Sequence, residues 1–212
     1  MAEALKTFRG SCHCGEYIYE VDLSENFEPT ECNCSFCYKK GALWTVPKPE
    51  NFRFVKGDIN TLTNYTFGLK TFNHKFCPNC GVQVLSIGYV ETPKPGEVKE
   101  PVTGFNHGPA WIYPTKEQVV LEGEDNLGVY LFNTKLFGKT FCKTCGIAVH
   151  NQRQPISEEQ LDAMPEGMRN WVKGSFGLMP INLRLFNDFN IKDLNVGQFD
   201  GYNQTQPRFV EP

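Results

Sequence analysis

Short stretches in which hydrophobic and polar residues alternate recur along the first half of the chain, as in 17–21, 52–55 and 82–85. Clusters of Gly, Pro and Asn separate these stretches. Alternation with a period of two is typical of β-strands that bury one face, and the separating residues are typical of turns. The pattern therefore predicts a mainly β protein built from short antiparallel strands.

One short helix is predicted after residue 157. Ser157 and Gln160 have the spacing of a capping box, in which each side chain accepts a hydrogen bond from the other residue's backbone amide. Leu161 and Met164 follow, and Pro165 ends the segment. A second helical turn is indicated around 168–172.

Three segments of the chain recur in the same order and at nearly the same spacing. Residues 41–47 match 108–114, residues 65–67 match 130–132, and residues 76–82 match 141–147. We interpret this as a duplicated β-unit, with a first unit over 1–95 and a degenerate second repeat plus a closing C-terminal segment over 96–212. The linker is expected within 91–101, which is rich in Pro, Gly and charge. The alternative is a chance similarity between two hairpins.

The composition of the 212-residue chain is typical of a folded protein, with 40% hydrophobic residues, 21% charged residues and a formal net charge of -3. No cluster of Lys and Arg suggests a nucleic-acid partner, and no run of about 18 apolar residues suggests a membrane span. The first eight residues lack the apolar core of a signal peptide. We expect a cytoplasmic protein, and the sequence leaves its oligomeric state open.

The expected reducing compartment determines which role the nine cysteines can have. Disulfides are rare there, so metal ligation becomes the leading explanation. The Cys12-His13-Cys14-Gly15 and Cys77–Gly81 segments are tight turns that each direct two sulfurs the same way. Together they predict a closed structural zinc site of four thiolates, and the alternative is four reduced cysteines without a metal.

A second cluster, Cys32-Asn33-Cys34-Ser35-Phe36-Cys37, has three sulfurs within six residues and no fourth cysteine beside them. Zinc with three protein ligands and one open position is the catalytic pattern, and a thiolate is the natural guest of such a sulfur-rich site. The alternative is a closed site that His74, His13 or a partner residue completes. With both clusters filled, each chain would hold two zinc ions.

Two further cysteines, Cys142 and Cys145, lie in the second repeat, which has no cysteines matching Cys32, Cys34 and Cys37. We interpret them as a vestigial dithiol. Two alternatives stay open: recruitment of His107 or His150 into a further metal site, and replacement of Cys77 and Cys80 in the first site.

In residues 8–88, the order and spacing of the three cysteine clusters, with His74 before Cys77, resemble the glutathione-dependent formaldehyde-activating enzyme and centromere protein V family. The resemblance implies an Mss4-like fold of antiparallel β-sheets with zinc knuckles. It also implies structural zinc ligands at Cys12, Cys14, Cys77 and Cys80, and ligands of a second, reactive zinc at Cys32, Cys34 and Cys37.

The same resemblance implies a carbon-sulfur lyase type of activity on the adduct of a thiol such as glutathione with a small carbonyl such as formaldehyde. Glutathione would then be a co-substrate. His74 is our candidate for moving the proton, with Glu31 and Tyr38 behind it. The rival functions are a non-catalytic zinc module that binds a protein partner, and a lyase that acts on a larger natural product.

Overall fold

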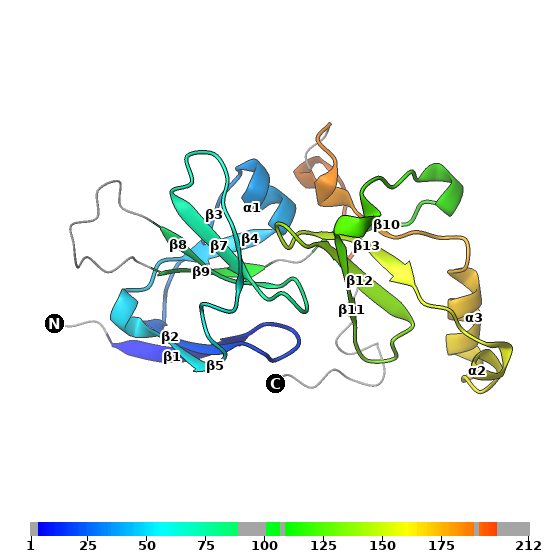
Figure 1. Ribbon diagram of the computed structural model, residues 1–212, viewed down its shortest axis with the longest axis horizontal. Coiled ribbons are helices and arrows are strands. Elements are labelled where there is room, and N and C mark those ends of the chain that lie inside the picture. The colour runs from blue at the N-terminus through cyan, green and yellow to red at the C-terminus, as the bar shows by residue number, and fades with distance from the viewer. Residues whose placement is uncertain (1–3, 89–100, 107–108, 189–190, 199–212) are drawn as a thin grey trace.

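The computed structural model of the chain describes residues 4–88, 101–106, 109–188 and 191–198, which form three antiparallel sheets (Figure 1). The first sheet has the order β1 (Leu5–Ser11), β2 (Ile18–Ser24), β5 (Phe52–Lys56). The second has the order β3 (Thr30–Glu31), β4 (Ala42–Thr45), β9 (Pro101–Asn106), β8 (Gln83–Gly88), β7 (Phe72–Phe76), β6 (Thr63–Tyr65). The third has the order β10 (Trp111–Ile112), β14 (Ile181–Asn182), β13 (Ala148–Arg153), β12 (Phe137–Cys142), β11 (Leu127–Leu131). The mainly β prediction is confirmed.

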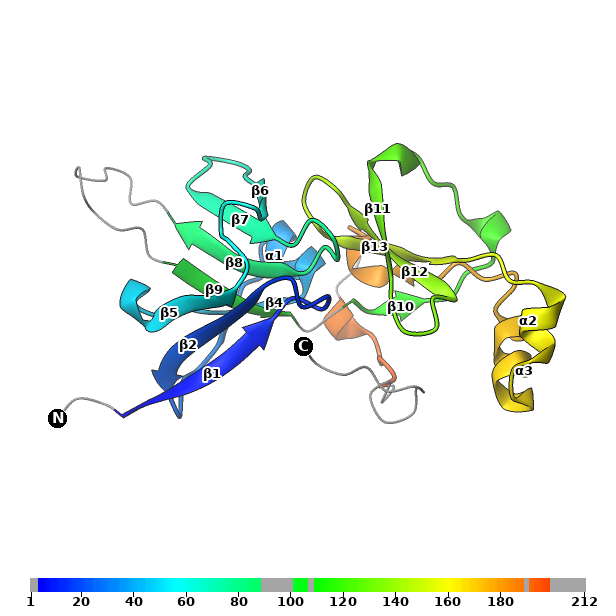
Figure 2. The ribbon, with the colours of Figure 1, turned by 60° about the horizontal axis from the view of Figure 1, so that its bottom comes forward.

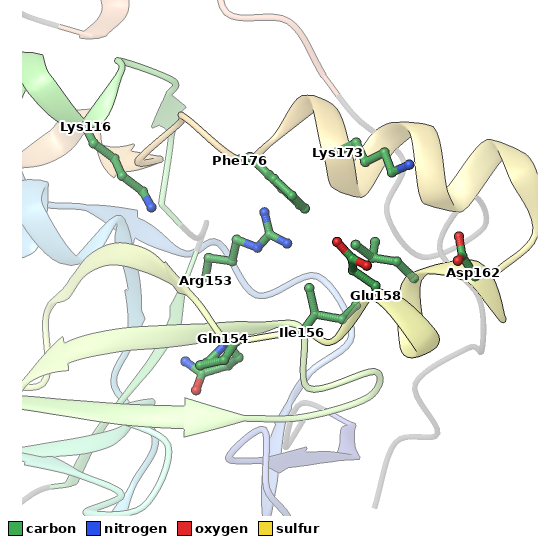
Figure 3. Close-up of a pocket in the computed structure, with 10 residues that line it drawn as sticks. Lys116, Arg153, Gln154, Ile156, Glu158, Asp162, Lys173 and Phe176 are labelled. Carbon is green, nitrogen blue, oxygen red and sulfur yellow. The ribbon is translucent and has the colours of Figure 1, made fainter.

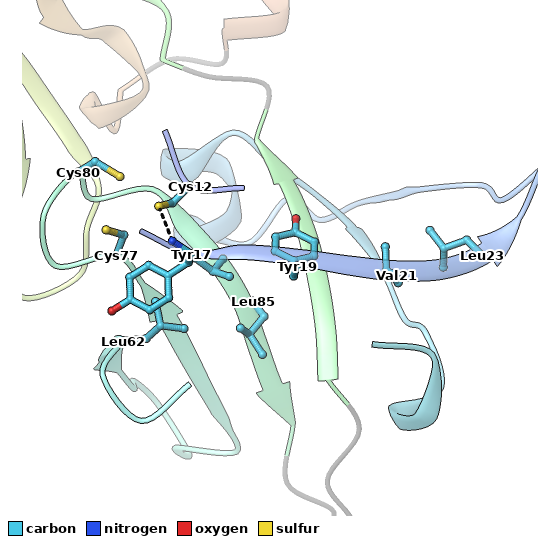
Figure 4. Packing of buried hydrophobic residues seen from close by; sticks show 10 residues of the cluster. Cys12, Tyr17, Tyr19, Val21, Leu23, Leu62, Cys77, Cys80 and Leu85 are labelled. Carbon is cyan, nitrogen blue, oxygen red and sulfur yellow. Dashed lines mark hydrogen bonds between the residues drawn. The ribbon is translucent and has the colours of Figure 1, made fainter. Parts of the chain in front are cut away.

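Strand β2 shows how the alternating pattern becomes a sheet. Tyr19, Val21 and Leu23 are buried on one face. Glu20 and Asp22 lie on the other face, where Arg53 of β5 binds both carboxylates at 2.7 and 2.9 Å. The buried face packs against Leu62, Val84 and Leu85 from the second sheet and its connections (Figure 4). Each fully buried aliphatic or aromatic side chain of this kind contributes about 1.5–3 kcal/mol to folding.

The described residues contain three short α-helices, where the sequence predicted one. Helix α2 (Glu158–Asp162) has the predicted capping box: Gln160 N donates to Ser157 Oγ at 3.2 Å, and Ser157 N donates to Gln160 Oε1 at 3.0 Å. Helix α3 (Glu166–Gly174) extends the turn indicated at 168–172. Helix α1 (Ser35–Lys40) was missed, because its six residues are too few to show a hydrophobic period.

The predicted duplication is visible in the strand order. Reading β4-β9-β8-β7-β6 against β10-β14-β13-β12-β11 gives the same succession of five strands. The register agrees as well, since Tyr65 pairs with His74 in one copy and Tyr130 pairs with Lys139, each 65 positions later, in the other. Each copy is therefore one hydrogen-bonded unit of the same design.

The division at residue 95 stays a prediction. Strand β9 pairs with β8 and β4, which favours extending the first unit to Asn106. Most of the expected linker, residues 91–100, lies outside the described residues. Figures 1 and 2 show the first two sheets in one half of the molecule and the third sheet in the other, with α2 and α3 at the far end.

The two copies pack through their matching CxxC turns. A Cβ on Gly81 would lie 2.5 Å from the ring of Phe141, and a Cβ on Gly146 would lie 2.7 Å from the ring of Phe76. Phe76 and Phe141 are matching residues, so each copy places its phenylalanine over the other copy's glycine. Among the described residues, no helix is long and apolar enough to cross a membrane.

We expect Gly81→Ala to destabilise the protein more than Gly123→Ala does. Both glycines have a left-handed backbone, with φ of 75° and 73°, but a Cβ on Gly123 would meet nothing within 4 Å. The control therefore carries only the backbone cost of about 1–2 kcal/mol, and Gly81→Ala adds an overpacking cost of about 1–3 kcal/mol. Denaturant unfolding of both zinc-saturated variants measures the difference. Equal losses would contradict the packing described between the copies.

Candidate metal centres

The four-sulfur cluster joins two strand pairs. Cys12 and Cys14 lie in the turn between β1 and β2, and Cys77 and Cys80 lie in the turn between β7 and β8. Their four Sγ atoms lie within 4.8 Å of one another, with 3.5 Å between Cys12 and Cys14 and between Cys14 and Cys77. Zn–S bonds of about 2.3 Å in a tetrahedron place sulfurs somewhat under 4 Å apart. The donor set fits a closed zinc site.

Glycines allow both turns to close. Gly15 and Gly81 have φ of 71° and 75°, and their amides donate to the carbonyls of Cys12 and Cys77 at 3.0 and 2.9 Å. A side chain at such a φ would be strained, so these positions favour glycine. The Tyr17 amide also donates to Cys12 Sγ at 3.4 Å. The backbone thus holds the sulfurs in place from both turns.

Hydrogen bonds among Cys12, Cys77 and Cys80 make the ionisation of these three thiols unequal. Hydrogen bonds from Cys77 and Cys80 lower the pKa of the Cys12 thiol, and the bond with Cys12 raises the pKa of Cys80 to about 12. The same partner also raises the pKa of Cys77. Without a cation, ionisation of Cys12 is therefore favoured, and ionisation of Cys77 and Cys80 is disfavoured. A bound metal ion removes this competition, because its charge deprotonates every coordinating thiol.

Long-range neighbours of this cluster were not predicted from the sequence. Glu16 accepts from Asn79 Nδ2 at 3.2 Å and lies 3.6 Å from Cys77 Sγ. His13 Nδ1 lies 3.1 Å from the hydroxyl of Tyr130, which comes from the other copy. Nothing in the spacing of the sequence relates residues 13 and 130. These contacts tie the first zinc knuckle to the second repeat.

The three-sulfur cluster lies where β3 meets α1. The Sγ atoms of Cys32, Cys34 and Cys37 lie within 4.8 Å of one another, and no other His, Cys, Asp or Glu of the described residues joins them. Cys37 is buried and receives a hydrogen bond from Trp44 Nε1 at 3.2 Å, whereas Cys34 is exposed. The cluster can hold a metal ion by three sulfurs on a side that solvent reaches.

Ionisation is unequal in this cluster. Burial raises the pKa of Cys37 to about 12, helped by its hydrogen bond with Cys34. Partial burial of the Cys34 sulfur opposes ionisation too, but hydrogen bonds from the Cys37 backbone and thiol outweigh it and lower its pKa. The exposed Cys34 therefore ionises more readily than the buried Cys37.

His74, the predicted proton carrier, is buried in an aromatic stack next to the three-sulfur cluster. Its ring centroid lies 4.2 Å from that of Phe36 and 5.3 Å from that of Phe67. Its Nδ1 lies 2.7 Å from Ser86 Oγ. Burial, assisted by the charge of Lys40, lowers the pKa of His74 to about 4. The imidazole is neutral at pH 7, and its catalytic role stays a prediction.

The two other proton-transfer candidates are engaged by the C-terminal segment. Glu31 forms an ion pair with Lys192 at 3.0 Å. The Tyr38 hydroxyl accepts from the Ile191 amide at 3.0 Å, and Lys39 Nζ donates to the Leu185 carbonyl at 3.0 Å. Leu185, Asn187 and Ile191 therefore contact α1 through Lys39 and Tyr38, and they help to position the cysteine that this helix carries. The end of the closing segment, residues 199–212, lies outside the described residues.

The alternative ligands among the described residues do not join a group of three or more. The structure brings Cys77 and Cys80, rather than Cys142 and Cys145, to the first cluster. No described His, Cys, Asp or Glu, His150 included, forms a group of three or more with Cys142 and Cys145. His107 lies outside the described residues.

A cavity of about 770 Å³ lies between the end of β13 and helices α2 and α3, and no cysteine is among its lining residues (Figure 3). Lys116, Arg153 and Lys173 line it together with Glu158 and Asp162. The Arg153 guanidinium lies 3.4 Å from the centroid of another lining residue, Phe176. None of the predicted site residues lines this cavity, which belongs to the second repeat and its helices.

Comparisons with known proteins match the first unit. The family model described as glutathione-dependent formaldehyde-activating enzyme matches residues 7–100. The crystal structure of a Rhodobacter sphaeroides protein, a structural genomics target, is 32% identical over 45% of this chain and 83% of that chain, with a TM-score of 0.36. The family match ends at residue 100, before the repeated segments at 108–114, 130–132 and 141–147.

We expect Cys77→Ser to lower the zinc content by one ion per chain, while Cys142→Ser leaves it unchanged. The two cysteines occupy matching turns, so comparing the two variants distinguishes the effect of losing a zinc ligand from the effect of losing a thiol. Because structural zinc contributes on the order of 10 kcal/mol to folding in small domains, Cys77→Ser should also lower the thermal midpoint by about 10 °C or more. Metal analysis and calorimetry test this. Zinc loss in Cys142→Ser would contradict the assignment.

We expect His74→Phe to flatten the dependence of stability on pH between about 6.5 and 4. With its folded-state pKa lowered to about 4, His74 takes up a proton in the unfolded chain before it does so in the folded one. Stability from this group is therefore complete above pH 6.5 and declines towards pH 4, by up to about 3 kcal/mol. Unfolding curves of wild type and variant measure it, and contributions common to both cancel. Parallel curves would contradict the buried, neutral imidazole.

Proposed function

We propose a function from the premise that the chain belongs to the glutathione-dependent formaldehyde-activating enzyme family, whose model matches residues 7–100. The protein joins a thiol such as glutathione to a small carbonyl such as formaldehyde, or splits the adduct. In the joining direction, the thiol sulfur forms a bond to the carbonyl carbon. The carbonyl π electrons move to oxygen, which takes up a proton in place of the one that the thiol lost.

The observation that carries this proposal is the unequal exposure of the three-sulfur cluster. Cys37 is buried and fixed by Trp44, while Cys34 is exposed, so the donor set has a closed side and an accessible side. Zinc held by these sulfurs would supply a Lewis acid and a position for a guest thiolate. A site sealed on all sides by protein would favour a structural role instead.

Aromatic side chains form one wall beside this cluster. Phe36, between Cys34 and Cys37 in the chain, stacks with Tyr65 at 5.7 Å and lies 5.3 Å from Phe67, which is 41% exposed. Such a wall excludes water from one side and leaves the other open to a polar thiol such as glutathione. We assign this wall the task of orienting the carbonyl carbon towards the sulfur.

His74 stays our candidate for proton transfer. With its pKa at about 4, the imidazole is neutral at pH 7, so it would accept the thiol proton rather than donate one. Ser86 lies within hydrogen-bonding distance of Nδ1, and Gln83 Nε2 donates to the same Ser86 oxygen at 2.9 Å. These hydrogen bonds from Gln83 through Ser86 to His74 fix the orientation of the imidazole ring, which a proton carrier requires.

We expect Cys34→Ser to abolish turnover and remove one zinc ion while the fold is kept. Cys34 is exposed and lies outside the four-sulfur cluster, so its loss should leave the thermal midpoint within a few degrees of wild type. The assay follows exchange of labelled formaldehyde with glutathione by NMR, with Cys142→Ser as the control that retains activity under reducing conditions. Full activity in a folded Cys34→Ser variant would overturn the proposal.

The same assay separates the rival functions. Retention of two zinc ions with no turnover of any small carbonyl would favour the non-catalytic module that binds a protein partner. Turnover that appears only with bulky thiol adducts would favour the lyase that acts on a larger natural product.

A further inference from the structure

Cys142 and Cys145 form a dithiol that the proposed function does not use. Their turn repeats the zinc knuckle of the first copy, since Cys142 N donates to Ile147 O at 2.9 Å and Gly146 N donates to Cys142 O at 2.7 Å. In the first copy two more sulfurs complete the cluster. Around the second, the described residues offer no further ligand to make a group of three. The turn thus has the backbone geometry of a zinc knuckle but lacks a complete set of metal ligands among the described residues.

A buried lysine faces this turn. Lys40, the last residue of α1, is 8% exposed, and its Nζ has no hydrogen-bond partner among the described residues. A Cβ on Gly146 would lie 2.9 Å from that Nζ, which also lies 5.4 Å from the ring centroid of Phe76. The ammonium group is therefore directed at the CxxC turn from within the core.

Such an ammonium needs a nearby anion, because a buried charge without a partner costs several kcal/mol. Burial lowers the pKa of Lys40 to about 8, and the negative charge of Cys145 and Cys142 opposes that shift. On the solvent side, Asn126 Nδ2 donates to Cys142 Sγ at 3.5 Å. Cation and donor both stabilise a thiolate in this pair.

We infer that Cys142 and Cys145 are a thiol–disulfide exchange pair, with Lys40 as the residue that stabilises its reduced form and a low-molecular-weight disulfide such as oxidised glutathione as its reaction partner. Cys142, which receives the Asn126 bond, is the attacking sulfur. Both cysteines are partly accessible and free in the structure.

The exchange proceeds in two balanced steps. The Cys142 thiolate attacks one sulfur of the small disulfide, whose S–S bond breaks and releases one thiolate with the bonding electron pair. Cys145 loses its proton to solvent and attacks the Cys142 sulfur of the mixed disulfide, which releases the second thiolate. The protein pair loses two electrons, and the small disulfide gains two and becomes two thiols.

The experiment equilibrates the zinc-loaded full chain with buffers of reduced and oxidised glutathione, followed by alkylation and peptide mass spectrometry. We expect a two-electron transition at Cys142 and Cys145, with the seven other cysteines still protected. Lys40→Met removes the charge that favours the reduced pair, so its disulfide should form at about tenfold lower oxidised glutathione. Lys39→Met is the matched control, because Lys39 bonds to Leu185 and Asn187 instead.

A second variant covers the case in which Lys40→Met does not fold. Asn126 is exposed, so Asn126→Asp is expected to fold and to replace the donor beside Cys142 with a negative charge. It should shift the midpoint in the same direction as Lys40→Met. The inference is overturned if the pair is not oxidised at any glutathione ratio, if it retains a third zinc ion, or if Lys39→Met shifts the midpoint as much as the Lys40 variant.

Discussion

The first unit depends on one constraint, the close approach of four cysteine sulfurs. Their Sγ atoms lie within 4.8 Å of one another, so thiolates at these positions repel one another unless a cation is present. Cys12 and Cys77 are completely buried, and hydrogen bonds with Cys77 and Cys80 lower the pKa of Cys12 while the pKa of each of these two partners is raised. A cation that neutralises all four would convert this competition into coordinate bonds between two β-turns. A bound ion would thereby fix the hairpin of β1 and β2 to the hairpin of β7 and β8, and residues of both hairpins contribute to the core of the first unit.

The second unit repeats the strand order of the first, and the two copies differ at corresponding turns. In the first copy the CxxC turn meets two more sulfurs. In the second copy it meets the ammonium of Lys40, which α1 brings from the first copy. The reciprocal contacts of Phe76 with Gly146 and of Phe141 with Gly81 keep the two turns adjacent. The same element, α1, thus carries Cys37 at one cluster and Lys40 at the other, and the C-terminal segment packs on it.

Much of the fold could be predicted from local pattern. The alternation in 17–21 corresponds to β2, the capping box at Ser157 begins α2, and the CxxC turns fall where Gly follows the second cysteine. The cysteine clusters were found because their ligands are close in sequence and need only one or two turns to converge. Helix α1 was missed because six residues rich in cysteine carry no periodic signal. The contacts of His13 with Tyr130 and of Trp44 with Cys37 involve side chains whose pairing no local spacing encodes.

By itself, the sequence determined the chemistry that is available: which residues are soft ligands, how they are grouped, and that the β-unit occurs twice. These features are local, since a CxxC turn directs its sulfurs through its own backbone. Only the tertiary structure decided which turns meet, that Cys34 is exposed while Cys37 is buried, and that Lys40 lies against the second dithiol. Burial and proximity between distant residues arise from packing of the whole chain, and they set the ionisation on which reactivity depends.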